Sequence, residues 1–134
     1  MVKTKNNVKS ASELANFLLE MLMFVKIYHW KTYSYAEHKA TDELYERLNE
    51  NIDRFIEVLL GKIYDKRLNM KNRQIKFQDP STKKEYIKII EEYILFLTIK
   101  IGKYIDDKKD TDLLNIRDEM VGDLNQLLYL FTFH

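Results

Sequence analysis

Apolar side chains recur every three or four positions along four long stretches of the sequence, which is the spacing of amphipathic helices. These stretches lie near residues 10–30, 34–65, 81–104 and 110–131. The chain has three Gly and one Pro, and such scarcity of helix breakers favours helices over a β fold with many turns. We therefore expect an all-α fold, an antiparallel four-helix bundle around one core. The expected core positions of the first two helices are Leu14, Phe17, Leu18, Met21, Val25 and Tyr28, then Leu44, Leu48, Ile52, Phe55, Leu59 and Ile63. Those of the last two are Ile87, Ile90, Ile94, Leu97, Ile101 and Tyr104, then Leu113, Leu114, Met120, Leu124, Leu127 and Phe131.

Three of the expected helices begin at a serine or threonine followed by a glutamate, which is the pattern of a capping box. The pairs are Ser10 with Glu13, Ser34 with Glu37, and Ser81 or Thr82 with Glu85. The fourth helix is expected to begin at Asp110–Thr111.

The connections between these helices differ in length. Short links join the first helix to the second and the third to the fourth, which predicts antiparallel neighbours. Residues 66–80 look irregular, with five cations and the single proline. This longer middle connection can cross the bundle from end to end.

Composition limits the classes of function. A chain of 134 residues suits one domain, here residues 10–134, preceded by a flexible basic tail at residues 1–9. The absence of cysteine excludes thiolate metal sites and thiol catalysis, and suits a reducing compartment such as the cytoplasm. The net charge of +1 gives no overall attraction to nucleic acid. We expect no membrane partner, because the apolar run at residues 17–28 is too short to span a bilayer.

The candidate chemistry lies along one flank of the second helix. His38, Asp42, Asp53 and Glu57 point to about 0°, 40°, 60° and 100° on a helical wheel, beside the core face. Together with His29 they offer imidazole and carboxylate ligands, which suit divalent iron, zinc or manganese. The other interpretation is an ordinary solvated flank, which is the usual fate of single acidic residues beside an apolar stripe.

The order of these residues resembles the ferroxidase segment of the Dps family of miniferritins, the DNA-binding proteins from starved cells. The stretch HWKTYSYAEHKATDELYERLNENIDRFIEVLLG, residues 29–61, has the family's His-Trp followed by His-x3-Asp-x10-Asp-x3-Glu. Leu44-Tyr45 and Leu60-Gly61 are also similar to the family. The resemblance implies a ferritin-like bundle that closes by one long connection. The ordinary ferritin pattern Glu-x-x-His is absent from this chain, which disfavours a di-iron site inside the bundle.

The resemblance also implies a site and an activity. His29 of one subunit would face Asp53 and Glu57 of a second subunit, while His38 and Asp42 would bind a second iron and Glu57 would bridge the two. The family oxidises Fe(II), preferring hydrogen peroxide, and stores the ferric product in a dodecamer, which protects against oxidative stress. For this chain we therefore expect a homo-oligomer, at minimum a dimer, with iron as the metal and zinc or manganese as alternatives.

Two rival functions remain open. The gap between His29 and His38 is shorter than the family's by about one helical turn and lacks its glycine, and the middle connection is also short, which favours a catalytically silent packaging scaffold. Alternatively, the protein coats nucleic acid, such as DNA, through the tail cations Lys3, Lys5 and Lys9 and the cations of the middle connection. The cations of the connection are Lys66, Arg67, Lys71, Arg73 and Lys76. The abundance of Lys, Asn, Ile and Tyr suggests an AT-rich genome, and a virion location would follow if the source is a large DNA virus. Several aromatic residues lie near the histidines in sequence: Trp30, Tyr28, Tyr33 and Tyr35. We assign none of them a redox role.

Overall fold

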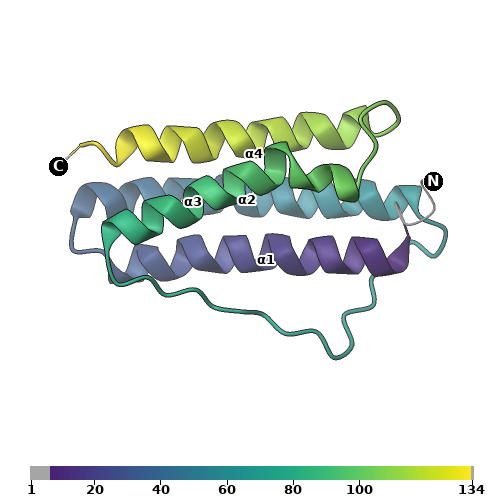
Figure 1. Cartoon of the computed structure of the whole chain (residues 1–134), viewed down its shortest axis with the longest axis horizontal. Coiled ribbons are helices and arrows are strands. Elements are labelled where there is room, and N and C mark those ends of the chain that lie inside the picture. The colour runs from purple at the N-terminus through teal and green to yellow at the C-terminus, as the bar shows by residue number, and fades with distance from the viewer. Residues whose placement is uncertain (1–6, 134) are drawn as a thin grey trace.

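The computed structural model describes residues 7–133, and over this range the chain contains helices and no strand. The elements are α1 (Val8–Lys31), α2 (Tyr35–Lys62), α3 (Lys83–Thr98), the short 3₁₀ helix η2 (Lys100–Lys103) and α4 (Thr111–Leu130). Figure 1 shows α1 antiparallel to α2, α3 parallel to α2, and α4 returning beside them. The predicted antiparallel four-helix bundle with one end-to-end connection is confirmed.

The crossover segment, residues 63–82, runs the length of the bundle along the outside of α1 (Figure 1). Polar side chains of α1 hold it there without any strand pairing. The amide of Asn69 donates to Ser12 Oγ at 2.9 Å, and the amide of Lys76 donates to Glu20 Oε2 at 2.8 Å. Asn16 Nδ2 also donates to the carbonyl of Gln74 at 3.1 Å. The segment predicted to be irregular therefore has a fixed path.

The helix starts agree only in part with the predicted caps. Thr82 Oγ1 accepts from the amide of Glu85, but the Glu85 carboxylate accepts from the amide of Ser81 and not from that of the cap residue Thr82, so this predicted box is only half formed. The first helix begins earlier than predicted, because Asn7 caps it and Ser10 takes the third position of a reciprocal box. The predicted Ser10–Glu13 box is therefore wrong. Lys9, assigned to the tail, lies exposed in the first turn of α1.

Most of the predicted stripe residues are buried, although five of them lie only partly buried against the core: Phe17, Tyr28, Ile87, Ile94 and Leu114. In α3 the buried aromatic residues Tyr86 and Tyr93 were not predicted. Leu18, Leu48, Ile90 and Leu124 are completely buried, one in each helix. Two predicted core residues of the third helix, Ile101 and Tyr104, are buried beyond its end. A 3₁₀ turn after Thr98 keeps them inside the bundle, so the predicted continuation of that helix is wrong although the burial is right.

Aromatic rings fill the space between α1 and α3. Tyr28 stacks on Tyr86 with 3.8 Å between ring centroids, and Phe17 stacks on Phe96 at 3.7 Å. Phe24 lies between these pairs and stacks on Tyr86 at 4.6 Å. Among the described residues, no helix is long and apolar enough to cross a membrane.

Candidate metal-binding face

His29, in the last turn of α1, and His38, in the first turns of α2, form a stacked pair. Their ring centroids lie 3.8 Å apart and their planes differ by 18°. His29 Nδ1 lies 2.7 Å from the carbonyl oxygen of His38, and His38 Nδ1 lies 2.8 Å from the carbonyl oxygen of His29. The turn at residues 32–34 is short enough to place each ring against the backbone of the other helix end.

These reciprocal contacts decide which ring nitrogen carries the proton. A carbonyl oxygen only accepts hydrogen bonds, so each Nδ1 must donate. In the neutral imidazoles, the lone pair is therefore on Nε2 of both residues. Metal-binding histidines are commonly oriented in this way, with one nitrogen donating to a backbone carbonyl and the other free for the metal.

The Nε2 atom of each ring makes no hydrogen bond within residues 7–133. Each ring therefore keeps one nitrogen with which it could bind a metal ion.

Thr41 supports this arrangement from one turn further along α2. Its hydroxyl donates to the carbonyl of Glu37 at 2.8 Å and lies 3.1 Å from His29 Nδ1. Thr41 is fully buried, and His29 is only 7 % exposed, whereas His38 is exposed. The pair is therefore held rigidly on the inner side and reaches solvent on the outer side.

The three predicted carboxylate ligands are exposed on α2 and do not all lie near the histidines. Asp42 follows His38 by one turn. Asp53 begins a second group, which lies about 22 Å from His38 along the helix axis. Residues 7–133 contain no group of three or more potential ligands close enough to hold one metal ion. One chain therefore presents two incomplete halves, with the histidines at one end of α2 and Asp53–Glu57 at the other.

A shallow apolar groove of about 230 Å³ borders Asp53. Its apolar walls come from α1, α2 and the crossover segment: Ala15, Leu19, Leu22, Ile52, Ile56 and Leu68. The groove and the carboxylates thus lie on the same face of the molecule.

The aromatic residues near the histidines are mostly at the surface. Trp30, Tyr33 and Tyr35 are 70 %, 106 % and 75 % exposed, so none of them packs in the core. The ammonium of Lys26 lies over the rings of Trp30, at 5.6 Å, and Tyr45, at 4.5 Å. Tyr28 differs from the others, because it packs in the bundle.

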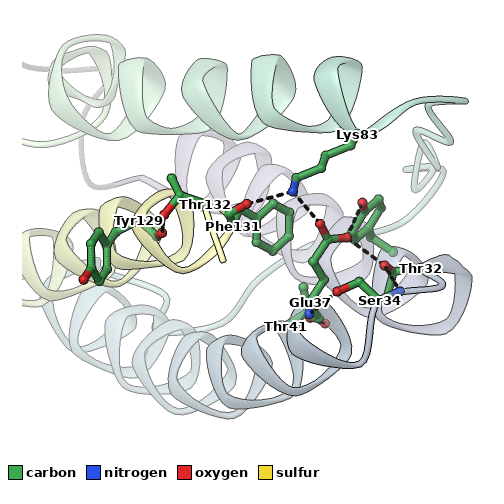
Figure 2. Close-up of polar contacts among 9 residues, drawn as sticks. Thr32, Ser34, Glu37, Thr41, Lys83, Tyr129, Phe131 and Thr132 are labelled. Carbon is green, nitrogen blue, oxygen red and sulfur yellow. Dashed lines mark hydrogen bonds and ion pairs between the residues drawn. The ribbon is translucent and has the colours of Figure 1, made fainter. Parts of the chain in front are cut away.

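A buried polar cluster beside the histidines was not anticipated from the sequence. Glu37, which is 5 % exposed, accepts at Oε1 from the hydroxyls of Tyr28, at 2.8 Å, and Thr32, at 2.7 Å. Lys83 of α3 binds Glu37 Oε2 at 2.7 Å and also donates to the carbonyl of Phe131 at 2.7 Å (Figure 2). The cluster ties both ends of the α1–α2 turn to α3 and to the end of α4.

Glu37 was predicted to complete a capping box with Ser34, and this is half right. Ser34 Oγ accepts from the amide of Glu37, but the carboxylate turns inward and the amide of Ser34 donates to Thr32 Oγ1 instead. Burial alone would raise the pKa of Glu37, but the hydrogen bonds from Lys83, Thr32 and Tyr28 outweigh it and lower that pKa below its ordinary value. Burial and the neighbouring Glu37 raise the pKa of Tyr28 to about 12. Both carboxylate oxygens of Glu37 accept hydrogen bonds from these donors, so the cluster holds the first turn of α2 in place.

The predicted nucleic-acid residues that the structure describes belong to α1 and to the crossover segment. Lys3 and Lys5 fall outside the described residues, and Lys9 is exposed on α1. In the crossover segment, Lys66 binds the carbonyl of Gly61 at 2.6 Å, while Lys71 and Lys76 are exposed.

Comparison with known proteins gives a family but no activity. Residues 29–131 match DUF5856, described as a family of unknown function. The chain belongs to this family. The matched region begins at His29 and contains all five candidate ligands. No curated protein and no solved structure matches the chain.

Proposed function

We propose that this DUF5856 protein binds Fe(II) and promotes its oxidation by peroxide or oxygen at a site shared between two copies of the chain, and thereby sequesters iron. The observation that supports it most is the stacked histidine pair, in which both Nδ1 atoms donate to carbonyls and both Nε2 atoms remain free. Imidazole and carboxylate together suit Fe(II), and few protein ligands leave positions open for an oxidant.

The spacing along α2 supports a second copy as the source of the missing ligands. His38 with Glu57, and Asp42 with Asp53, are symmetric about the same point, midway between Arg47 and Leu48. Two antiparallel α2 helices crossing at that point would place His38 opposite Glu57 of the partner subunit, and Asp42 opposite the partner's Asp53. A two-fold axis repeats the arrangement, so one dimer would hold two equal sites.

Each side chain then has a role in holding the Fe(II) substrate. His29 and His38 present neutral nitrogens from a fixed position, and the Glu37 cluster and Thr41 keep their backbone anchors in place. Asp42, Asp53 and Glu57 supply negative charge that balances the cations. The family resemblance assigns Glu57 as the ligand between two irons.

The activity is tested by removing one half of the site. We expect Fe(II) oxidation with peroxide, followed by absorbance of the ferric product, to be clearly faster with the protein than without it. The double variant Asp53→Ala/Glu57→Ala should return the rate to background, because the histidines alone cannot complete the site. The matched control Glu91→Ala/Glu92→Ala removes two exposed carboxylates of α3 and should keep the rate. An unchanged rate in the first variant would rule out the assigned site.

A second candidate function is coating of nucleic acid. The stretch at residues 66–78 carries five cations and no carboxylate, and it lies along the surface in an irregular, non-helical conformation. Phosphate contacts made by such cations are independent of sequence and weaken with salt. If this is the function, retardation of DNA should persist in Asp53→Ala/Glu57→Ala and fall when residues 1–6, which precede the Asn7 cap of α1, are removed. A silent scaffold would show neither activity and would still form a defined oligomer.

A further inference from the structure

The outer flank of α2 carries an unbalanced set of negative charges. Along the flank of α2 that begins at His38 and extends about 120° round the helical wheel, the ionised side chains are five carboxylates and one ammonium, Lys39. The five carboxylates are Asp42, Glu46, Glu50, Asp53 and Glu57. All of them are exposed, and none makes an ion pair or a hydrogen bond within residues 7–133. Other acidic residues of the chain do find partners, such as Asp79 with Lys31 at 2.6 Å.

This charge pattern opposes the pairing that the site requires. In the antiparallel arrangement, Asp42 faces Asp53 of the partner subunit, and Glu46 and Glu50 lie near the two-fold axis beside their own copies. Like charges brought together in this way repel, and the repulsion grows as water is excluded. The attractive apolar contact is limited, because Leu19 is the only apolar side chain lining the neighbouring groove that is substantially exposed, at 37 %.

A divalent cation between the carboxylates of two copies would replace their repulsion by attraction to the cation. Resting on the proposed function, we propose that divalent metal ions switch the chain from a self-repelling monomer to a two-fold symmetric dimer paired through α2. The cations lie where carboxylates of both copies meet, beside His29 and His38 of one copy. Because metal binds the dimer and not the separated halves, each metal bound favours association by mass action. Assembly is then controlled by the metal that the assembly holds.

The experiment measures association without any oxidation. The full chain is treated with a chelator, then examined by sedimentation equilibrium alone and with Zn²⁺, which binds the same N/O ligands and has no redox chemistry. We expect a monomer with chelator and a dimer or a multiple of it with Zn²⁺, with a dissociation constant lower by about tenfold or more. High salt without metal should also favour association, because it screens exposed charges.

A neutral variant separates charge repulsion from loss of ligands. Asp53→Asn/Glu57→Gln keeps the shape and removes two charges per chain, so it should associate more strongly than the wild type in chelator and respond little to Zn²⁺. A general loss of folding would instead weaken association in both conditions, and circular dichroism would detect it. The control Glu91→Gln/Glu92→Gln on α3 should behave like the wild type in both conditions.

Two results would overturn the proposal. One is a wild-type dimer that is equally stable in chelator and in Zn²⁺, and the other is a neutral variant that still needs Zn²⁺ to associate. Failure of the oxidation assay gives a different outcome, since Zn²⁺-dependent dimers without Fe(II) oxidation would retain the switch and remove only the ferroxidase activity. Fe(II) oxidation by a dimer that forms without metal would retain the ferroxidase activity and remove the switch.

Discussion

Glu37 connects several parts of the chain at one end of the bundle. Three donors from three different parts of the chain meet at its carboxylate: Tyr28, Thr32 and Lys83. Removal of this acceptor leaves the two partly buried hydroxyls without it, while Lys83, with 42 % of its side chain exposed, can turn to water. We expect Glu37→Ala to lower the free energy of unfolding in urea by about 1–3 kcal/mol. Glu46→Ala, an exposed residue without partners, should change it by no more than about 0.5 kcal/mol.

The contribution of Glu37 should depend on pH in one direction. Its pKa in the folded chain lies below the ordinary value of 4.5, so the stabilisation is fully present above pH 4.5 and is lost as the pH falls through the lower, folded-state pKa. Wild type and Glu37→Gln, compared by urea unfolding at several pH values, should therefore differ most near neutral pH and converge in acid. A difference that grows on acidification would contradict the cluster as described.

The two most informative residue contacts could not be predicted from the sequence, for a shared reason. The spacing of Ser34 and Glu37 fits a capping box equally well, and only the fold brings Lys83 to Glu37 from a distant part of the chain. The stacking of His29 on His38 likewise depends on the path of the turn between two helices. Both histidines were predicted as ligands from residue type and order, but the donation of both Nδ1 atoms to backbone carbonyls is a property of the folded turn.

At the scale of elements, local periodicity was sufficient for the helices and insufficient for their ends. The stripe of α3 continues to Ile101 and Tyr104 in the sequence, and these residues are indeed buried, so periodicity could not reveal that the α-helix ends at Thr98 and a 3₁₀ helix follows at Lys100–Lys103. Asn7 was missed because Ser10 offers an equally good cap. The path of the crossover segment was predicted only as a connection, since its contacts with α1 are made by polar residues that carry no periodic signal.

The crossover segment gives a prediction of its own. It is irregular, and Ser12, Asn16 and Glu20 of α1 hold it through single hydrogen bonds. Glu20→Ala should therefore release the region around Lys76 without unfolding the bundle, because locally held segments open independently of the core. We expect trypsin to cut after Lys71, Arg73 or Lys76 faster than in the wild type, while the thermal midpoint stays nearly the same. Glu50→Ala, which removes an exposed carboxylate of α2, should leave the cutting rate unchanged, and equal rates in Glu20→Ala would show that Glu20 does not hold the segment.

At the scale of the whole molecule, one chain does not form a complete metal site of the proposed kind by itself. The histidine pair and the Asp53–Glu57 pair lie at opposite ends of α2, about 22 Å apart, so neither half can complete the other within one chain. The fold separates these halves, and the symmetric spacing along α2 allows two copies to join them twice. The central claim is therefore that each site takes histidines from one subunit and carboxylates from the other.

Mixing two inactive variants tests this claim most directly. His29→Ala/His38→Ala lacks one half of every site, and Asp53→Ala/Glu57→Ala lacks the other, so each alone should oxidise Fe(II) at the background rate. When equal amounts are unfolded in urea and refolded together, mixed dimers contain one complete site of two. We then expect about a quarter of the wild-type activity, the random pairing of two subunits in a two-fold dimer. A mixture that stays at background, while each variant refolds and the wild type is active, would contradict a shared site.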